Sequence, residues 1–241
     1  MRIAVISDIH GNLDALMQVI HDIDRSDIDA TICLGDSIGY GPEPNEVLQL
    51  LISRKIPSVS GNHEMVVEYP DKLNQFNPEA RRSFEITINM LSEETLCFIR
   101  DMERFLIFYG CRFVHGFPPE SVSTYLFQMT KNDIRRVLTQ TKERLCFVGH
   151  THELEFIGSD GRHLIHLRPG KGIIQLLKYN KYIMSAGSVG QPRDDDNSAK
   201  YLIFDSTEDT IEIRYIPYDI EQVVKKIIAA GLPRSNADRL R

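Results

Sequence analysis

The first sixty residues alternate between short apolar runs and segments with helical periodicity, and this alternation constrains the fold more than any other feature. Residues 3–6 form a run rich in β-branched side chains, which is typical of a buried strand. Residues 12–23 then place apolar side chains at helical spacing. The same order recurs, with strands expected at 31–34 and 57–59 and a helix from Pro44 to Ile52 between them. This order predicts a parallel, helix-flanked sheet of the α/β class.

The segment from about residue 77 to residue 104 interrupts the alternation. Its apolar side chains keep helical spacing throughout, and Ser92 followed by Glu94 predicts a fresh helix start in its middle. We expect a helical insert over 77–104. Such an insert could shape access to a site, form a dimer face or simply cover the sheet, and the sequence favours none of these.

The rest of the chain is expected to be mostly β. Strands are predicted at 105–108, 111–114, 145–148, 154–157, 164–167, 173–177, 182–185, 201–204 and 211–216. Helices are predicted around 134–138 and over 220–230, and the polar tail after Pro233 is expected to be disordered. With no internal repeat or low-complexity linker, one domain over 1–241 is predicted.

Composition excludes several classes of protein. The 28 Lys and Arg residues against 34 Asp and Glu residues give a net charge of −6, which argues against non-specific binding to nucleic acid. Four cysteines without a C-x-x-C pair indicate a reducing compartment, so we expect a cytoplasmic protein. No apolar stretch approaches the roughly 20 residues of a membrane span, so no membrane association is expected. The sequence predicts no oligomeric state.

Five predicted strands each lead into residues that can bind metal. The motifs are Asp8-Ile9-His10, Gly35-Asp36, Gly61-Asn62-His63-Glu64, His115-Gly116 and Gly149-His150-Thr151-His152. Each motif alone has a plainer explanation, such as a turn or a buried histidine. Ligands of open α/β sheets bind at the carboxyl ends of the strands, so the five motifs would converge if their strands share a sheet.

The donor atoms in these motifs suit divalent ions of intermediate softness. Leaving His63 aside, the motifs supply two aspartates, one asparagine and four histidines, and no thiolate. Carboxylate, amide and imidazole donors together suit Mn²⁺, Zn²⁺, Fe²⁺ or Ni²⁺. Seven ligands exceed the need of one structural zinc ion but fit two ions that share a carboxylate. A pair of ions about 3.5–4 Å apart is the arrangement used in phosphoryl transfer.

The five motifs, in this order, resemble the signature of the calcineurin-like metallophosphoesterases. The segment from Gly187 to Asp194 is also similar to one in the small prokaryotic phosphodiesterase branch of that superfamily. The resemblance implies a four-layer α/β/β/α sandwich of two mixed sheets flanked by helices. It implies two divalent ions, with Mn²⁺ expected first and Fe, Ni²⁺ or Zn²⁺ as alternatives.

The resemblance also implies a role for each residue. A first ion would be held by Asp8, His10 and His152, and a second by Asn62, His115 and His150, with Asp36 bridging the two. His63 would face the scissile phosphate and stabilise charge or protonate the leaving oxygen, and Glu64 would orient or polarise His63.

One departure from the family pattern bears on the substrate. In the protein-phosphatase branch the Gly-Asp motif continues into an acidic residue and a phosphate-binding arginine, whereas here Ser37 to Gly41 contains no cation. The departure disfavours a phosphoprotein substrate. Arg193 is the nearest candidate for the missing charge, with a turn arginine paired with the acidic residues 194–196 as the alternative.

The function expected from this resemblance is hydrolysis of small phosphodiesters by metal-activated hydroxide. Two alternatives within enzymes are a dinucleoside polyphosphate hydrolase and a small-molecule phosphomonoesterase. A non-catalytic scaffold of the same fold is the alternative from another class. The complete set of seven ligand positions together with His63 favours an enzyme over the scaffold.

Overall fold

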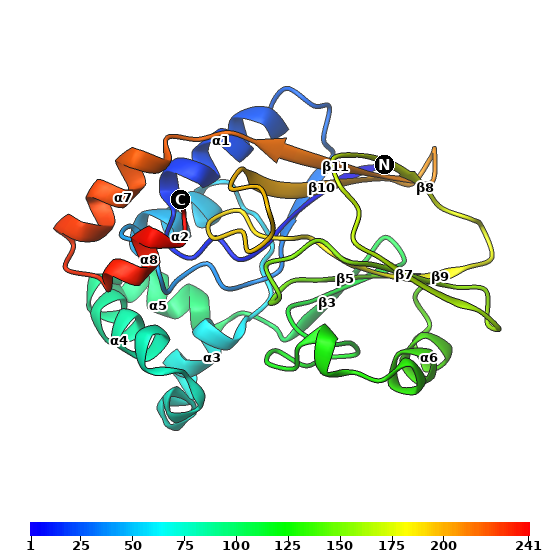
Figure 1. Ribbon diagram of the computed structural model, residues 1–241, viewed down its shortest axis with the longest axis horizontal. Coiled ribbons are helices and arrows are strands. Elements are labelled where there is room, and N and C mark those ends of the chain that lie inside the picture. The colour runs from blue at the N-terminus through cyan, green and yellow to red at the C-terminus, as the bar shows by residue number, and fades with distance from the viewer.

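Two mixed β-sheets stack face to face in the computed structural model, which describes residues 1–241 (Figure 1). The first sheet has the order β2-β1-β10-β11-β8, with β1 (Arg2–Ile6), β2 (Ala30–Cys33), β8 (Gly172–Gln175), β10 (Ala199–Asp205) and β11 (Thr210–Ile216). The second has the order β3-β4-β5-β9-β6-β7, with β3 (Phe105–Phe108), β4 (Cys111–Val114), β5 (Leu145–Val148), β6 (Phe156–Ser159), β7 (Leu164–Leu167) and β9 (Lys181–Ser185). Parallel and antiparallel pairs occur in both sheets, which confirms the predicted fold class.

Helices cover the outer faces and one end of this sandwich. They are α1 (Leu13–Ile23), α2 (Pro44–Ser53), α3 (Asn62–Glu68), α4 (Pro78–Thr87), α5 (Glu93–Arg100), α6 (Lys131–Gln140), α7 (Ile220–Ala229) and α8 (Arg234–Asp238), with 3-10 turns η1 (Pro70–Gln75), η2 (Ile88–Met90) and η3 (Leu126–Gln128). Helices α1 and α2 pack on the first sheet and α6 on the second, which gives four layers. Helices α4, α5, α7 and α8 gather at one end, on the left in Figure 1.

Strand β1 shows why the buried runs are continuously apolar. Ile3 and Val5 point into the core between the two sheets, where Phe113 of the second sheet also lies. Ala4 and Ile6 point the other way and pack beneath α1 and α2. A strand covered on both faces gains by placing an apolar side chain at every position.

One expectation about the strands is wrong. Residues 57–59 form no strand but only isolated bridges, from Ser58 to Cys33 and from Val59 to Glu103, because the chain turns at Gly61 into α3. The motif-bearing strands are divided between the two sheets: β1 and β2 belong to the first sheet, and β4 and β5 to the second.

The helical segments largely follow the expected pattern, with one correction at the end of the chain. Asn77 caps α4 and Ser92 caps α5, as the capping pattern indicates, although the helical stretch already begins at Asn62. The tail after Pro233 is ordered rather than disordered, because Ala237 and Leu240 bury their side chains against α7. None of the helices combines the length and the apolar character that a membrane span requires.

Candidate metal centre

The predicted site residues meet at one end of the sandwich, where β1, β2, β4 and β5 end and α3 begins. Five of them have a left-handed backbone, with φ between 50° and 69°: Asp8, His10, Asp36, His150 and His152. Non-glycine residues rarely adopt this conformation, and it recurs at functional sites. Here it turns each side chain back towards the space between the two sheets' ends.

Close approach of the loops requires glycine at two of the positions beside these residues. A Cβ on Gly61 would lie 2.5 Å from the backbone nitrogen of Asp36, and one on Gly149 would lie 2.7 Å from Asp8 Oδ2. Only glycine, which has no Cβ, leaves room at position 61 for Asp36 and at position 149 for Asp8.

The first group of donor atoms consists of Asp8, His10 and His152, all buried. Nε2 of His152 lies 3.2 Å from Asp8 Oδ1 and 3.0 Å from Nε2 of His10. Donors about 2.1 Å from a shared ion lie about 3 Å apart, so these separations match a coordination sphere.

The second group consists of Asp36, His115 and His150. Nε2 of His115 lies 3.3 Å from Asp36 Oδ2 and 3.2 Å from Nδ1 of His150. Asp36 Oδ2 also lies 3.7 Å from Nε2 of His10, which places this carboxylate between the two groups. A third, overlapping group joins His10, Asp36 and His63.

Main-chain carbonyl groups orient the four imidazoles of these two groups. One ring nitrogen of each histidine lies within hydrogen-bonding distance of a carbonyl oxygen: His10 with Ile38 at 2.9 Å, His115 with Leu34 at 2.8 Å, His150 with Ser123 at 3.1 Å and His152 with Gln191 at 2.6 Å. When that nitrogen donates its proton to the carbonyl, the other nitrogen presents a lone pair to the carboxylates. This arrangement is typical of histidines that bind metal.

Among the buried oxygen atoms that lack a hydrogen-bond partner, two belong to predicted ligands. They are Asp8 Oδ1 and Asn62 Oδ1. Leaving a buried acceptor unsatisfied is costly unless a cation or another donor completes it. The orphan oxygens and the converging imidazole nitrogens together fit a pair of divalent ions.

The electrostatics of the centre put Asp8, His10 and His150, but not His115, in the protonation states that bind cations. Burial opposes ionisation of Asp8, but the facing His152 and His115 hold its pKa well below the ordinary value. Burial lowers the pKa of His10 strongly and that of His150 to about 3, so both rings are neutral at pH 7. Burial also acts to lower the pKa of His115, but the negative charge of Asp36 outweighs burial and raises the pKa of His115 to about 9. Binding of a cation would therefore release a proton from His115.

Glu64 does not contact the His63 ring, which corrects the expectation that it orients or polarises that residue. Its carboxylate accepts hydrogen bonds from the backbone N–H groups of Asp36 (2.8 Å), Ser37 (2.7 Å), Ile38 (3.3 Å) and Gly61 (2.9 Å). Burial, together with the charge of Asp36, raises the pKa of Glu64 to about 7. Glu64 is a positioning residue that holds the loop of Asp36 against the start of α3.

Arg193 lies beside the first group but belongs to none of the ion pairs in the structure. Its backbone N–H donates to the carbonyl of His152 at 3.3 Å, and its guanidinium donates to Gln191 Oε1 at 3.2 Å. The alternative pairing with its acidic neighbours does not form, because Asp194 pairs with the buried Lys200 at 2.7 Å. The positive charge of Arg193 opposes the rise that burial causes in the pKa of the Tyr125 hydroxyl.

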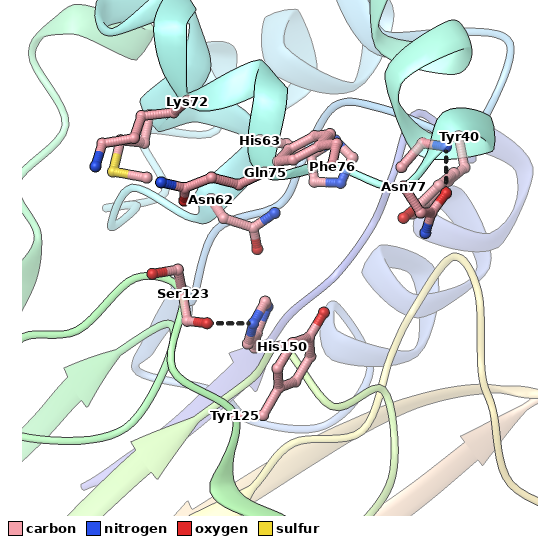
Figure 2. Close-up of a pocket in the computed structure, with 12 residues that line it drawn as sticks. Tyr40, Asn62, His63, Lys72, Gln75, Phe76, Asn77, Ser123, Tyr125 and His150 are labelled. Carbon is pink, nitrogen blue, oxygen red and sulfur yellow. Dashed lines mark hydrogen bonds between the residues drawn. The ribbon is translucent and has the colours of Figure 1, made fainter. Parts of the chain in front are cut away.

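A cavity of about 310 Å³ opens beside the centre (Figure 2). Helical segments between residues 62 and 80 form one wall, and the loop of Ser123 and Tyr125 with His150 forms the other. Sequence reasoning missed Tyr125, although it lies in the loop that follows the His115 motif. It also missed Phe76 and Lys72, which fall just before the expected start of the helical insert.

Comparison with known proteins places this geometry in a family. The chain matches the calcineurin-like phosphoesterase superfamily domain over residues 1–209. An uncharacterized protein of Methanocaldococcus jannaschii is 38% identical over 245 residues, which span 99% of this chain and 96% of that protein.

Two solved structures are similar to this chain over nearly its whole length. A metallophosphoesterase from Sphaerobacter thermophilus is 32% identical, with a TM-score of 0.85 over 100% of this chain and 98% of that one. A hypothetical protein from Pyrococcus horikoshii OT3 shares the fold at 16% identity, with a TM-score of 0.81 over 99% and 97% of the two chains. The chain belongs to the calcineurin-like phosphoesterase superfamily.

Proposed function

We propose that this protein is a di-metal phosphodiesterase that hydrolyses small phosphodiesters. The observation that carries the proposal is the pair of donor groups that meet at Asp36. Main-chain carbonyls orient the imidazoles of both groups, and the two groups adjoin a cavity. The mixed oxygen and nitrogen donors without thiolate favour Mn²⁺, with Fe²⁺, Ni²⁺ and Zn²⁺ as alternatives. Two such ions, when bound, supply Lewis acidity and a nucleophilic water near neutral pH.

His63 is the residue of this chain best placed to act on the leaving group. It lines the cavity, and its buried Nδ1 has no hydrogen-bond partner. Burial lowers the pKa of His63 to about 4, so the ring is neutral at pH 7 and keeps one N–H. With that N–H, His63 can hydrogen-bond the leaving oxygen while negative charge develops on it.

The charges around the cavity favour a diester over a monoester. A dianionic monoester needs cations beyond the metal ions beside the phosphate that is cleaved. The cavity lining contains no arginine, and its one lysine, Lys72, lies at the opposite end from Asn77 and Tyr40. Arg193 is exposed at the edge of the centre and does not line the cavity. A monoanionic diester needs less compensation, and the hydrogen bond from His63 can stabilise the alkoxide that leaves. The cavity volume of about 310 Å³ suits a small substrate.

A metal-by-substrate screen tests the proposal. Protein stripped with a chelator is reloaded separately with Mn²⁺, Fe²⁺, Ni²⁺, Zn²⁺ or Mg²⁺, and its metal content is measured by elemental analysis. We expect two ions per chain, activity restored best by Mn²⁺, and a higher kcat/KM for bis-p-nitrophenyl phosphate than for p-nitrophenyl phosphate. A diadenosine polyphosphate serves as the third substrate, because faster cleavage of it would favour the hydrolase alternative.

Arg193→Ala is the control for substrate class. If the wild type prefers the monoester and Arg193→Ala removes that preference, Arg193 binds the extra charge of a monoester and the diesterase proposal is wrong. A single ion per chain, or full activity without metal, would refute the two-metal centre.

A further inference from the structure

The cavity beside the metal centre contains a lysine that no carboxylate neutralises. Lys72, on η1, lines this cavity together with Met65 and Gln75. Arg81 on α4 pairs with Glu85 at 3.0 Å and Arg239 pairs with Glu79 at 3.6 Å, whereas Lys72 forms no ion pair in the structure. An unpaired ammonium group in a substrate cavity attracts an anion.

The rest of the lining supports an anionic occupant. Of the 241 residues of the chain 34 are acidic, yet none of the 12 residues that line this cavity carries a carboxylate. Amide side chains from Asn62, Gln75 and Asn77 line it instead. Amides and an ammonium group donate hydrogen bonds to oxyanions without the repulsion that a carboxylate would cause.

Lys72 lies at one end of the cavity. Figure 2 shows Lys72 at the opposite end of the cavity from Asn77 and Tyr40, with Gln75 and Asn62 between them. The candidate metal ligands that reach the cavity are Asn62 and His150, so a phosphate bound there leaves Lys72 for another part of the substrate.

We propose that Lys72 binds a second anionic group, a carboxylate or a phosphate, carried on the organic part of the diester. The Gln75 amide, which adjoins it in the lining, donates a further hydrogen bond to that group. This inference rests on the proposed phosphodiesterase function and names its substrate class. The preferred substrates are diesters with at least one negative charge beyond that of the scissile phosphate.

A matched pair of p-nitrophenyl diesters tests the inference on the metal-loaded protein. In one diester the second alcohol carries a carboxylate, and in the other it carries the corresponding carboxamide. We expect the wild type to prefer the carboxylate about threefold to fivefold in kcat/KM, the range of an exposed ion pair. Lys72→Met should abolish the preference without slowing the carboxamide, and Lys72→Arg should keep it. The preference should also fall as salt is added.

Lys178→Met is the matched control, because Lys178 is exposed and lies outside the cavity lining. A third diester, with phosphate in place of the carboxylate, shows which anion is preferred. The inference would be overturned if the wild type hydrolysed all the diesters with equal kcat/KM. It would also be overturned if Lys72→Met lowered kcat/KM by the same factor for all of them. Failure to hydrolyse any diester would instead refute the proposed function. Calorimetric binding of the carboxylate and carboxamide diesters to wild type and Lys72→Met would then still decide the role of Lys72.

Discussion

His63 differs from the other histidines of the centre in what its ring contacts. The other four each place one ring nitrogen against a main-chain carbonyl, whereas Nδ1 of His63 has no partner. Its ring packs instead against Phe76 and Tyr40, with centroids 4.7 Å and 5.1 Å away. Packing, rather than a main-chain hydrogen bond at Nδ1, therefore holds this ring. Catalysis and metal binding should therefore respond differently to mutation of this residue.

His63→Ala should leave the metal content near that of the wild type while it lowers kcat about 10²- to 10⁴-fold, the loss typical of a general acid or base. Asp36→Asn should lower the metal content itself, because the charge between the two donor groups is lost. Elemental analysis beside steady-state kinetics separates the two effects.

The leaving group provides the internal control for His63. The penalty of His63→Ala should be larger for alkyl leaving groups than for p-nitrophenolate, which leaves without a proton. Because His63 also forms a group with His10 and Asp36, the variant could instead lose its metal ions. That result would make His63 a ligand rather than a catalytic residue.

The sequence predicts which residue types gather at the centre but not every role within it. Asp8 and His152 could be found because each follows a recognisable apolar run. The function of Glu64 could not be found in this way, since its carboxylate binds the loop of Asp36 and Ser37, and only the folded chain brings that loop to α3. The left-handed backbone at Asp8 and His152 likewise depends on tertiary contacts.

At the scale of elements, local patterns place most strands to within two residues and fail where tertiary contacts decide the structure of a segment. Strand β7 has the predicted limits, 164–167, whereas β6 lies two residues beyond its predicted range of 154–157. The tail after Pro233 is too polar on average to predict a packed helix. It is ordered because Ala237 and Leu240 pack against the buried face of α7.

One carboxylate ties α1 to the first sheet. Asp22 accepts hydrogen bonds from the Tyr201 hydroxyl at 2.6 Å and from Nη2 of Arg214 at 2.7 Å. Burial opposes its ionisation, but the bonds from Arg214 and Tyr201 hold the pKa of Asp22 below 3.8. A depressed pKa means that the stabilisation is present above pH 3.8, the value for the unfolded chain, and is lost as the pH falls through the folded-state value.

Asp22→Asn should therefore lower the free energy of unfolding by about 1–2 kcal/mol at pH 7, and by less as the pH falls below 3.8. Urea denaturation at pH 7 and at about pH 3 measures both values. Asp27→Asn, on the exposed turn after α1, is the control and should leave the free energy of unfolding unchanged at both pH values. An equal loss at the two pH values would show that the carboxylate charge contributes nothing.

At the scale of the whole molecule, both sheets are built from strands that lie far apart in the chain. Strand β1 pairs with β10, and β5 pairs with β9. An apolar run indicates that a strand is buried, but it does not indicate which strand lies beside it. The local pattern alone therefore led to a single sheet, and only the family resemblance predicted the sandwich. The metal centre forms because both sheets end at the same place.

The C-terminal helix joins two other distant parts of the molecule. The side-chain amide of Asn236, which is buried on α8, donates hydrogen bonds to the carbonyl of Tyr40 and to Ser83 Oγ, each at 2.9 Å. Ser83 belongs to α4, and the Tyr40 ring lines the substrate cavity and packs 4.7 Å from the His10 ring. Residues at the end of the chain therefore help to fix a wall of the cavity.

Asn236→Ala should lower the free energy of unfolding by about 1–3 kcal/mol, because the carbonyl of Tyr40 loses its buried donor. It should also raise KM for bis-p-nitrophenyl phosphate while leaving the metal content unchanged, since Tyr40 belongs to the cavity and not to the donor groups. Arg234→Ala, at an exposed position of the same helix, should change none of these. If Asn236→Ala destabilises the fold with KM unchanged, α8 supports the fold alone. If KM rises with it, the tail belongs to the substrate site, although it lies beyond residue 209, where the match to the family domain ends.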